Sequence, residues 1–499
     1  MTTKPAPGQK MQLFDLAGRR VLVVGLGESG LAMARWAAFK GAAGITVADT
    51  RDAPARLDAL RAEVGAARFV PGPLAGALLD DIDLVAWSPG LSIEIGDSAA
   101  FWRLAGERAL PVLGEIELFA QALAELREQG YAPKLIAITG TNGKTTTTRL
   151  VAQLCEQARR RTQAAGNIGP AALDALREAI AADRLPEVWV LELSSFQLAG
   201  SHSLRADAAT ILNVSQDHLD WHASTQSYVA AKQRIYGPGT VAVFNRDDPA
   251  TLPARSGRRC SFGLQPPQAS GDFGMVTDGG LEWLVQAVPQ DDTGGRRRKE
   301  PVPVSIKRLM PADALRIQGS HNQANALAAL ALAAAVGVPM GPMLHALRAF
   351  AGEPHRCQRV ATIAGVDYYD DSKGTNVGAT AAALRGLGKT CVLIAGGDAK
   401  GQDFAPLVEP VRRHARAVVL IGRDGPRLAG ALAGAGVPLA AADSLQQAVL
   451  LASERAHAGD AVLLSPACAS FDMFRNYGHR AEVFIAAVHA LAEPAGAPC

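Results

Sequence analysis

The segment Leu135–Thr146, LIAITGTNGKTT, decides the fold. Its first five residues form a short apolar run of the kind that makes a buried parallel strand, and the residues after it, TTTRLVAQLCEQ, favour a helix. The intervening glycines let successive backbone N–H groups face a triphosphate, and the helix N-terminus adds positive potential. Strand, glycine loop and helix in this order predict an α/β domain that binds phosphate.

Two side chains of the loop can act on the phosphates. Lys144 can reach the terminal phosphates, and the Thr145 hydroxyl can join a Mg²⁺ shell. The upstream glycine of the full GxxxxGK[ST] pattern is missing, so an ordinary glycine-rich turn between strand and helix is the alternative. The loop alone does not separate ATP from other nucleotides.

A second glycine motif, Gly25-Leu-Gly-Glu-Ser-Gly30, follows the apolar run Val21–Gly25 and precedes a helical stretch that Gly41 ends. Asp49 closes the next expected strand, where a Rossmann protein holds a ribose hydroxyl. Read alone, this pattern favours a nicotinamide dehydrogenase. The diphosphate of a UDP-sugar would suit the same glycines, because they show only close backbone approach and anion binding at a helix N-terminus.

The whole chain has the length and rhythm of three α/β blocks. Its 499 residues suggest about three domains at roughly 100–200 residues each. Short apolar strands alternate with helical stretches three times over, which predicts parallel sheets. We expect a Rossmann-like domain over residues 1–114, a central phosphate-loop domain over 115–352 and a second Rossmann-like domain over 353–499.

Composition excludes several classes of protein. Apolar residues are 48% and charged residues 20%, as in ordinary globular chains. Fifty Lys and Arg against 48 Asp and Glu leave a net charge of +2, too balanced for a general nucleic-acid binder. The longest apolar run, Ala326–Val338, is too short to cross a bilayer, and no secretory signal is visible at the start. Six scattered cysteines without a CxxC pair favour a reducing, cytoplasmic setting.

Polar groups follow the strands of the second block. Glu192 lies in LELSSFQL, Asp217 and His218 in QDHLD, and Lys232 in AAKQRIY. Ligands of open α/β sheets bind at the carboxyl ends of the strands, and Glu192 and His218 are possible Mg²⁺ ligands. Each alone could be a helix cap or a satisfied polar contact, but their arrival after successive strands favours a metal site.

The segment Pro289–Pro303, PQDDTGGRRRKEPVP, departs from the α/β rhythm. Its basic run could contact a nucleic acid or a membrane, but the run lies beside acidic residues between Gly and Pro. We therefore interpret it as a solvated loop, and deletion of its RRRK portion should change activity little.

The motifs resemble the Mur ligases in order and spacing over nearly the whole chain. Those enzymes add amino acids to the peptidoglycan precursor with ATP. The matching motifs are GTNGKTT (140–146), AGNIG (165–169), LELSSFQL, the DH of QDHLD, AAKQRIY, GSHNQAN (319–325), PHR (354–356) and DDSKGTN (370–376). GEIELF (114–119), GGDAKGQDF (396–404) and SPACASFDMF (465–474) resemble the branch that adds D-glutamate. The DNPR motif of the branch that adds diaminopimelate or lysine is not found, and the phosphate loop lies too far from the N-terminus for a folylpolyglutamate synthase.

This resemblance implies a ligase that takes ATP, UDP-N-acetylmuramoyl-L-alanine and D-glutamate through an acyl phosphate, with no nucleic-acid or membrane partner and as a monomer. It implies two Mg²⁺ ions and a carbamylated Lys232. The implied roles are ATP binding by Gly140, Thr141, Asn142, Gly143, Lys144, Thr145, Thr146, Asn322, Asn325 and Asp371; metal binding by Thr145, Glu192, His218 and Lys232; and phosphoryl transfer by Lys144, His218, Lys232, Arg356 and Lys373. The residues implied to bind the UDP substrate are Glu28, Ser29, Thr50, Arg51, Gly90 and Asn167. Those implied to bind D-glutamate are Thr375, Lys400, Ser470, Phe471 and Tyr477.

Three positions, in two places of the sequence, depart from the family pattern. Glu28 and Ser29 stand where Leu and Thr are usual, and Glu28 places a carboxylate near a diphosphate. Tyr477 stands where Phe is usual and adds a hydroxyl beside the amino-acid pocket.

Two other classes of protein remain as alternatives. A dehydrogenase would leave the phosphate loop unused, and a non-catalytic nucleotide switch would leave the third block unused.

Overall fold

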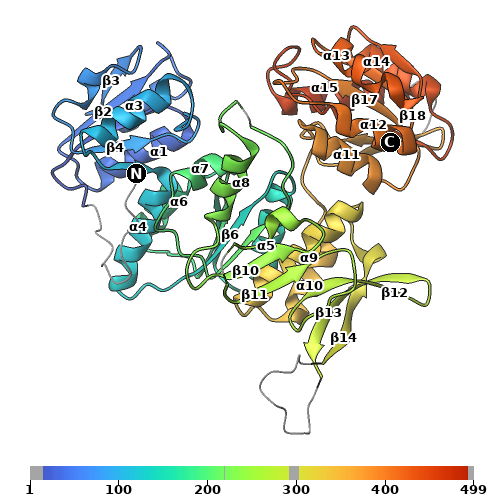
Figure 1. Cartoon of the computed structure of the whole chain (residues 1–499), viewed down its shortest axis with the longest axis horizontal. Coiled ribbons are helices and arrows are strands. Elements are labelled where there is room, and N and C mark those ends of the chain that lie inside the picture. The colour runs from blue at the N-terminus through green and yellow to red at the C-terminus, as the bar shows by residue number, and fades with distance from the viewer. Residues whose placement is uncertain (1–14, 219, 255, 291–302, 493–499) are drawn as a thin grey trace.

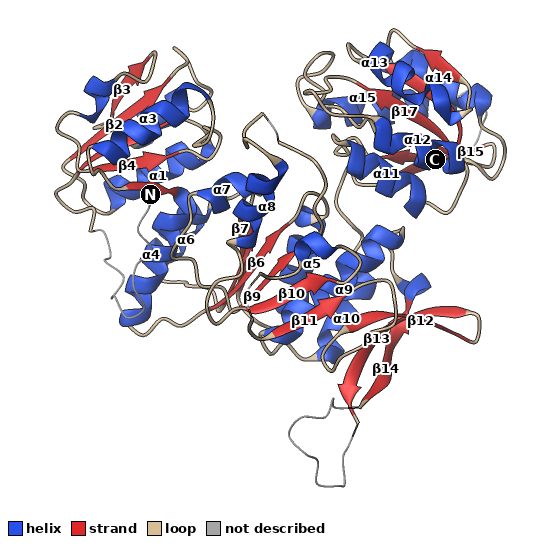
Figure 2. Cartoon of the chain, viewed as in Figure 1, coloured by secondary structure: helices blue, strands red, loops and turns tan. Residues whose placement is uncertain are grey.

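The computed structural model describes residues 15–218, 220–254, 256–290 and 303–492. Three α/β blocks follow one another along the chain (Figures 1 and 2). The first and last blocks lie apart in the view of Figure 1, and the central block joins them. The three-block α/β fold predicted from the sequence is confirmed.

The first block is a five-stranded parallel sheet in the order β3-β2-β1-β4-β5. Buried side chains of β1 alternate between its two faces: Val21 and Val23 pack with helix α1, and Leu22 and Val24 pack with helix α3. The chain order reverses beside β1, which opens a crevice at the carboxyl ends of β1 and β4. The elements are β1 Arg20–Val24, α1 Glu28–Phe39, β2 Gly44–Asp49, α2 Leu57–Glu63, β3 Arg68–Pro71, β4 Leu84–Trp87, α3 Gly96–Glu107 and β5 Val112–Gly114.

The central block is a six-stranded parallel sheet in the order β11-β10-β9-β6-β8-β7. Helices α5 and α9 cover one face, and α4 and α6 cover the other. The long apolar run of the sequence is α9, which is buried almost all round, so it is a core helix. The elements are α4 Glu115–Glu128, β6 Lys134–Thr139, α5 Lys144–Gln157, β7 Thr162–Gly166, α6 Ala172–Ala181, β8 Val188–Glu192, α7 Ser195–Ala199, β9 Ala208–Ile211, α8 Thr225–Gln233, β10 Val241–Asn245, β11 Arg259–Phe262, α9 Ser320–Ala335 and α10 Met340–Ala349.

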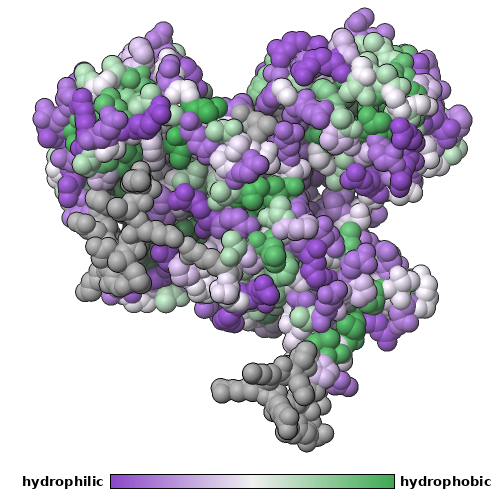
Figure 3. Space-filling view, viewed as in Figure 1, coloured by the Kyte–Doolittle hydropathy of each residue, from purple (hydrophilic) through white to green (hydrophobic). Residues whose placement is uncertain are grey.

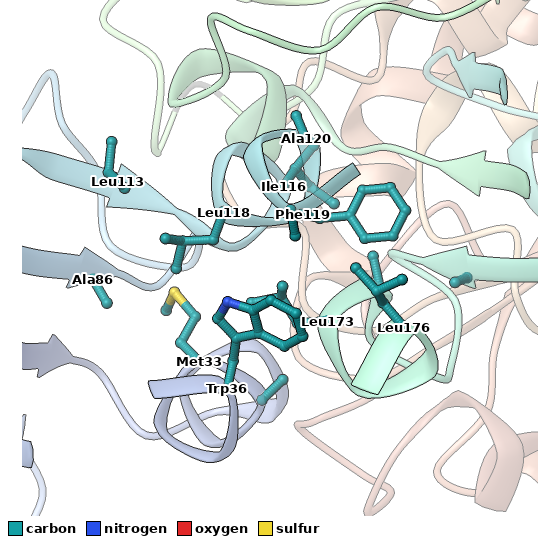
Figure 4. Close-up of a cluster of buried hydrophobic side chains, with 14 of the residues drawn as sticks. Met33, Trp36, Ala86, Leu113, Ile116, Leu118, Phe119, Ala120, Leu173 and Leu176 are labelled. Atoms are coloured by element: carbon teal, nitrogen blue, oxygen red, sulfur yellow. The ribbon is translucent and has the colours of Figure 1, made fainter. Parts of the chain in front are cut away.

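The first and central blocks share one hydrophobic core. Met33 and Trp36 of α1 pack toward Leu118 of α4 and Leu173 of α6 (Figure 4). Trp36 is 4% exposed, so its indole ring is removed from water at the junction itself. Burial of side chains of this size contributes roughly 1.5–3 kcal/mol each, which joins the two blocks firmly.

The central block also carries an antiparallel sheet of β12 (Phe273–Asp278), β13 (Leu281–Pro289) and β14 (Val304–Pro311). Gly279 and Gly280, with φ of +60° and +79°, form the two-residue turn between β12 and β13. The predicted solvated loop Pro289–Pro303 falls between β13 and β14, and its residues 291–302 lie outside the described residues.

The last block is a six-stranded sheet in the order β15-β16-β20-β17-β18-β19, parallel except for the edge strand β15. Helices α11, α12 and α13 cover one face, and α14 and α15 cover the other. The elements are β15 Gln358–Ile363, β16 Val366–Asp370, α11 Val377–Gly386, β17 Cys391–Gly396, α12 Val408–His414, β18 Ala415–Ile421, α13 Gly425–Leu432, β19 Leu439–Ala441, α14 Leu445–Arg455, β20 Ala461–Leu464 and α15 Tyr477–Ala492.

Polar and apolar side chains are interspersed over the face of the molecule seen in Figure 3. Within the described ranges, none of the helices has the length and apolar character that crossing a membrane requires.

Candidate functional site

A cavity of about 410 Å³ opens at the carboxyl ends of β1 and β4. The glycine motif shapes its floor: a Cβ on Gly30 would lie 1.9 Å from the Gly25 carbonyl oxygen, so only glycine lets α1 approach β1 this closely. The five residues of the first block that we predicted to bind the UDP substrate all line this cavity: Glu28, Ser29, Thr50, Arg51 and Gly90.

Two carboxylates at this cavity are already paired with arginines. The unusual Glu28 forms an ion pair with Arg56, which balances its charge near the expected diphosphate. Asp49 accepts hydrogen bonds from Arg51 Nε and Nη2, both at 2.8 Å, and from the Leu26 N–H at 2.7 Å. Burial opposes ionisation of Asp49, but these bonds lower its pKa to about 2. Arg51 therefore already binds the Asp49 carboxylate, which is the group that a dehydrogenase would use to bind a ribose hydroxyl.

The phosphate loop connects β6 to α5, as predicted. Gly140 and Gly143 have φ of +155° and +81°, which favour glycine, and Lys144 begins the helix. Lys144 Nζ donates to the carbonyl oxygens of Gly140 and Thr141, both at 2.9 Å. Burial lowers the pKa of Lys144. Two neutral carbonyls are weak partners for an ammonium, so a triphosphate would be a stronger acceptor for it.

Glu192 and Asn167 meet beside this loop. Glu192 Oε1 accepts a hydrogen bond of 2.8 Å from Asn167 Nδ2, while its Oε2 is buried without a hydrogen-bond partner among the described residues. An unpaired buried carboxylate oxygen is costly unless a cation or donor reaches it, which fits a metal ion. Asn167 thus lies at this carboxylate, outside the lining of the cavity of the first block.

Lys232 is 2% exposed and lies against the same loop. Its Nζ donates to the Gly140 carbonyl oxygen at 3.0 Å and lies 4.5 Å from the centre of the Tyr228 ring. Burial and the nearby Lys144 ammonium hold the pKa of Lys232 well below its usual value. A lowered pKa makes the neutral, nucleophilic form of this amine easier to reach than in an exposed lysine.

His218 lies on the loop after β9, with Nε2 3.6 Å from Asp217 Oδ2. Burial lowers the pKa of His218, which favours the neutral imidazole that metals bind. Among the residues that the structure places, no three His, Cys, Asp or Glu side chains cluster as a metal-binding group. A cation held by Glu192 and His218 would therefore need further ligands, such as phosphate oxygens and the Thr145 hydroxyl.

A second cavity, of about 430 Å³, lies between the central and last blocks. Several residues that we predicted to bind ATP line it: Asn142, Gly143, Thr146, Asn322, Asn325 and Asp371, together with Arg356. Arg356 Nη2 reaches across to Thr145 Oγ1 at 3.3 Å, so the last block contacts the phosphate loop directly. Burial raises the pKa of Asp371 to about 7, and burial also lowers the pKa of Lys373 to about 8.

The residues predicted to receive D-glutamate lie past the carboxyl ends of β16, β17 and β20. Backbone hydrogen bonds between Asp398 and Ala469, of 3.0 and 2.8 Å, join the loops that carry Lys400 and Ser470. Ser470 is 3% exposed, whereas Phe471 is 69% exposed. Thr375 lies on the loop after β16, and the Tyr477 carbonyl accepts a hydrogen bond of 2.8 Å from Ser372 Oγ.

Two buried charged residues that support the sites were not predicted from the sequence. Arg480 is fully buried and donates to the Ser372 hydroxyl, the Ser372 carbonyl and the Cys468 carbonyl, which ties the loop after β16 to the loop after β20. Glu115, within the quoted motif GEIELF, accepts hydrogen bonds from Ser29 Oγ at 3.1 Å and the Leu173 N–H at 3.2 Å. Both are charged residues buried on helices, Arg480 on α15 and Glu115 on α4, and both helices carry further charged residues, so charge alone did not single them out.

Three stretches match known protein families. Residues 19–100 match the Mur ligase MurD-like N-terminal domain, residues 138–333 the Mur ligase middle domain, and residues 355–468 the Mur ligase glutamate ligase domain.

Two curated relatives are similar over almost the whole chain. The UDP-N-acetylmuramoylalanine--D-glutamate ligase of Ralstonia nicotianae is 59% identical over 97% of this chain and 99% of its own length. That of Burkholderia mallei is 58% identical over 95% of this chain and 97% of its own length.

Solved structures share the fold at low identity. The UDP-N-acetylmuramate-alanine ligase of Thermotoga maritima aligns with a TM-score of 0.54 at 20% identity, over 95% of this chain and 99% of that one. Folylpolyglutamate synthase of Mycobacterium tuberculosis, complexed with ADP, aligns with a TM-score of 0.52 at 17% identity, over 74% and 95%.

Proposed function

The chain belongs to the Mur ligase family, and we propose that it uses ATP to join D-glutamate to UDP-N-acetylmuramoyl-L-alanine. The observation that carries this proposal is the 59% identity, over nearly the full length of both chains, to a ligase named for this reaction. The two cavities agree with it, because one has the glycines and arginine of a diphosphate site and the other borders the phosphate loop.

The chemistry requires an activated carboxylate, because hydroxide is a poor leaving group at pH 7. An oxygen of the substrate carboxylate attacks the γ-phosphorus of ATP and ADP leaves, giving an acyl phosphate. The amine of D-glutamate then attacks the acyl carbon and inorganic phosphate leaves. In the first step an anion approaches a polyanion, and each like-charge pair at 4 Å costs about 4 kcal/mol at an effective dielectric constant near 20.

Cationic side chains offset that repulsion. Lys144 lies in the loop itself, and Arg356 reaches Thr145 from the last block. Lys373 follows on the loop after β16, and its lowered pKa reflects both burial and the neighbouring Arg356. We assign these three residues to the transferring phosphoryl group, whose charge they stabilise as it develops.

Glu192, His218, the Thr145 hydroxyl and a carbamylated Lys232 would hold two Mg²⁺ ions. The unpaired buried Glu192 Oε2 supports this assignment, as does the neutral imidazole of His218. Bound there, Mg²⁺ would neutralise phosphate charge and polarise the γ-phosphate. Asn322, Asn325 and Asp371 would hold the adenosine in the second cavity.

Consumption of ATP separates this function from the two alternatives. We expect release of ADP and phosphate only when UDP-N-acetylmuramoyl-L-alanine and D-glutamate are both present. Release of phosphate without D-glutamate would indicate a hydrolytic switch. Oxidation of a substrate by NAD, without release of ADP, would indicate a dehydrogenase that uses the first block alone.

Ser470→Ala is expected to raise the KM for D-glutamate about tenfold or more, because a hydrogen bond to a charged group contributes about 1.5–3 kcal/mol. Ser470 is buried and follows Ala469, whose backbone is bonded to the loop that carries Lys400, which supports its assignment to a carboxylate of D-glutamate. The KM values for ATP and the UDP substrate, measured on the same preparation, are internal controls that should stay within about threefold. Equal weakening of all three substrates would remove Ser470 from the glutamate site.

We propose that the monomer is the catalytic unit, because this chain by itself forms both cavities to which the substrates are assigned. We also propose a cytoplasmic location, because ATP is the phosphoryl donor.

A further inference from the structure

The loop that lines the first cavity is hydrogen-bonded to a loop of the central block. Pro89 of the cavity wall accepts a hydrogen bond of 3.0 Å from Trp221 Nε1 through its carbonyl oxygen. Ser92 Oγ donates to the Trp221 carbonyl oxygen at 2.6 Å. Ser92 and Trp221 are 8% and 4% exposed, so water competes little for these bonds. The two loops are more than a hundred residues apart in sequence and are held as one surface.

Glu94, on the same loop of the first block, contacts three residues of the central block. Its Oε2 accepts hydrogen bonds from the Ala223 N–H at 2.9 Å and from Ser227 Oγ at 2.7 Å, and its Oε1 lies 3.3 Å from His222 Nδ1. His222 is fully buried, and its Nε2 lies 3.0 Å from Ser195 Oγ. Because an ionised carboxylate only accepts, Nδ1 carries the proton and Nε2 accepts from Ser195. His222 thereby connects the loops after β4 and β9 to the start of α7.

The same central loop carries His218. The His218 carbonyl oxygen accepts the N–H groups of Trp221 at 3.1 Å and His222 at 2.9 Å. The Phe196 ring contacts both residues, with its centre 4.8 Å from that of Trp221 and 4.7 Å from that of His218. A displacement of Trp221 or His222 would therefore displace His218.

We propose that Glu94, Trp221 and His222 are positioning residues that fix the distance between the sugar-nucleotide cavity and the phosphoryl-transfer residues. This inference rests on the proposed function, in which one long substrate has its UDP end in the first cavity and its carboxylate at the γ-phosphate of ATP. With the UDP end bound, the separation of the two loops sets where the carboxylate arrives. The shared core around Met33 and Trp36 already joins the blocks, so these polar contacts act on alignment more than on folding.

Glu94→Gln tests the proposal, because its amide group would face donors where an acceptor is needed. Misplacement of a reacting group by 1 Å lowers rates by about a hundredfold, so we expect kcat to fall at least about tenfold. The KM for ATP should stay within about threefold, since the second cavity does not contain these residues. With the carboxylate misaligned, water competes for the γ-phosphate, and amide formed per ATP consumed should fall below one. A merely structural role would not change that ratio.

Glu107→Gln is the matched control, because Glu107 is an exposed glutamate of the same block at the end of α3. If Glu94→Gln does not fold, Ser92→Ala combined with Ser227→Ala removes two of the hydroxyl contacts while Glu94 keeps the Ala223 N–H and His222 as partners, and the same loss of kcat and coupling is expected. Wild-type kcat with one amide per ATP in the folded variants would overturn the proposal. Loss of all activities in parallel with thermal stability would also overturn it. Absence of any ligase activity in the wild-type protein would instead contradict the proposed function.

Discussion

Lys144→Ala is expected to yield a folded protein whose turnover at saturating ATP is lower by at least about a hundredfold, the loss seen when one electrostatic transition-state group is removed. Lys144 begins α5 directly after the glycine loop, and its ammonium donates to two backbone carbonyls, each at 2.9 Å. Alanine is the best helix former, so the helix should persist. The loss should appear in the burst of acyl phosphate as well as in steady-state turnover, because the ammonium acts in the first chemical step.

Lys134→Ala provides the matched control. Lys134 lies at the opposite end of the same strand, β6, where it is exposed and paired with Asp207 at 3.0 Å. An exposed ion pair contributes about 0–1 kcal/mol to stability, so this variant should keep wild-type turnover. Turnover of Lys144→Ala above about a tenth of wild type, a loss smaller than about 1.4 kcal/mol, would remove Lys144 from the transfer step.

The predictable part of the fold is the part with buried parallel strands. Runs such as Val21–Gly25 and Leu135–Thr139 are apolar on both faces, because helices cover both sides of each sheet. The antiparallel sheet β12–β14 was not predicted. It has one exposed side, and its strands alternate weakly, so the paired glycines 279–280 were its clearest signal.

The same distinction applies to the candidate site, where residues within a local motif could be predicted and contacts between separate motifs could not. Residues in local motifs were predicted, and those of the first block lie together at one cavity. The Glu28–Arg56 pair and the contacts of Glu94 with His222 and Ser227 were not predicted, because they join side chains whose motifs are separate. Sequence spacing carries no sign of such pairs: the first depends on how one block folds, and the contacts of Glu94 depend on how the first block packs against the central block. The role of Asn167 toward the muramoyl group stays a prediction, since this side chain contacts Glu192.

Lys232→Ala is expected to be nearly inactive, and a small carboxylate such as acetate is expected to restore part of the activity. The reason is the state of the Lys232 amine, which is buried beside the Lys144 ammonium with its pKa held well below the usual value. A neutral amine can attack CO₂ to give a carbamate and release a proton. The product is an anion, so the charge beside Lys144 changes from a repelled cation to an attracted carboxylate-like group.

This change from positive to negative charge explains how a buried lysine can act as a metal ligand. An ammonium only donates, whereas a carbamate offers two oxygens to Mg²⁺ alongside His218 and Glu192. Acetate entering the space left by Lys232→Ala would supply similar oxygens. Mass spectrometry of the wild-type protein in bicarbonate should detect the added CO₂ on Lys232. A bare amine there, together with a crystal structure grown in bicarbonate that shows the same amine, would end the carbamate proposal and leave the phosphate-loop assignment standing.

Lys144→Ala is the control for the rescue, because that variant loses a cation in the same pocket. Acetate carries the wrong charge to replace an ammonium beside a triphosphate, so it should not restore Lys144→Ala at any concentration that restores Lys232→Ala. Methylammonium should show the opposite preference if each added ion acts by charge. Rescue of both variants by acetate would indicate a general effect of the salt, and the distinction between a cationic Lys144 and an anionic Lys232 would then fail.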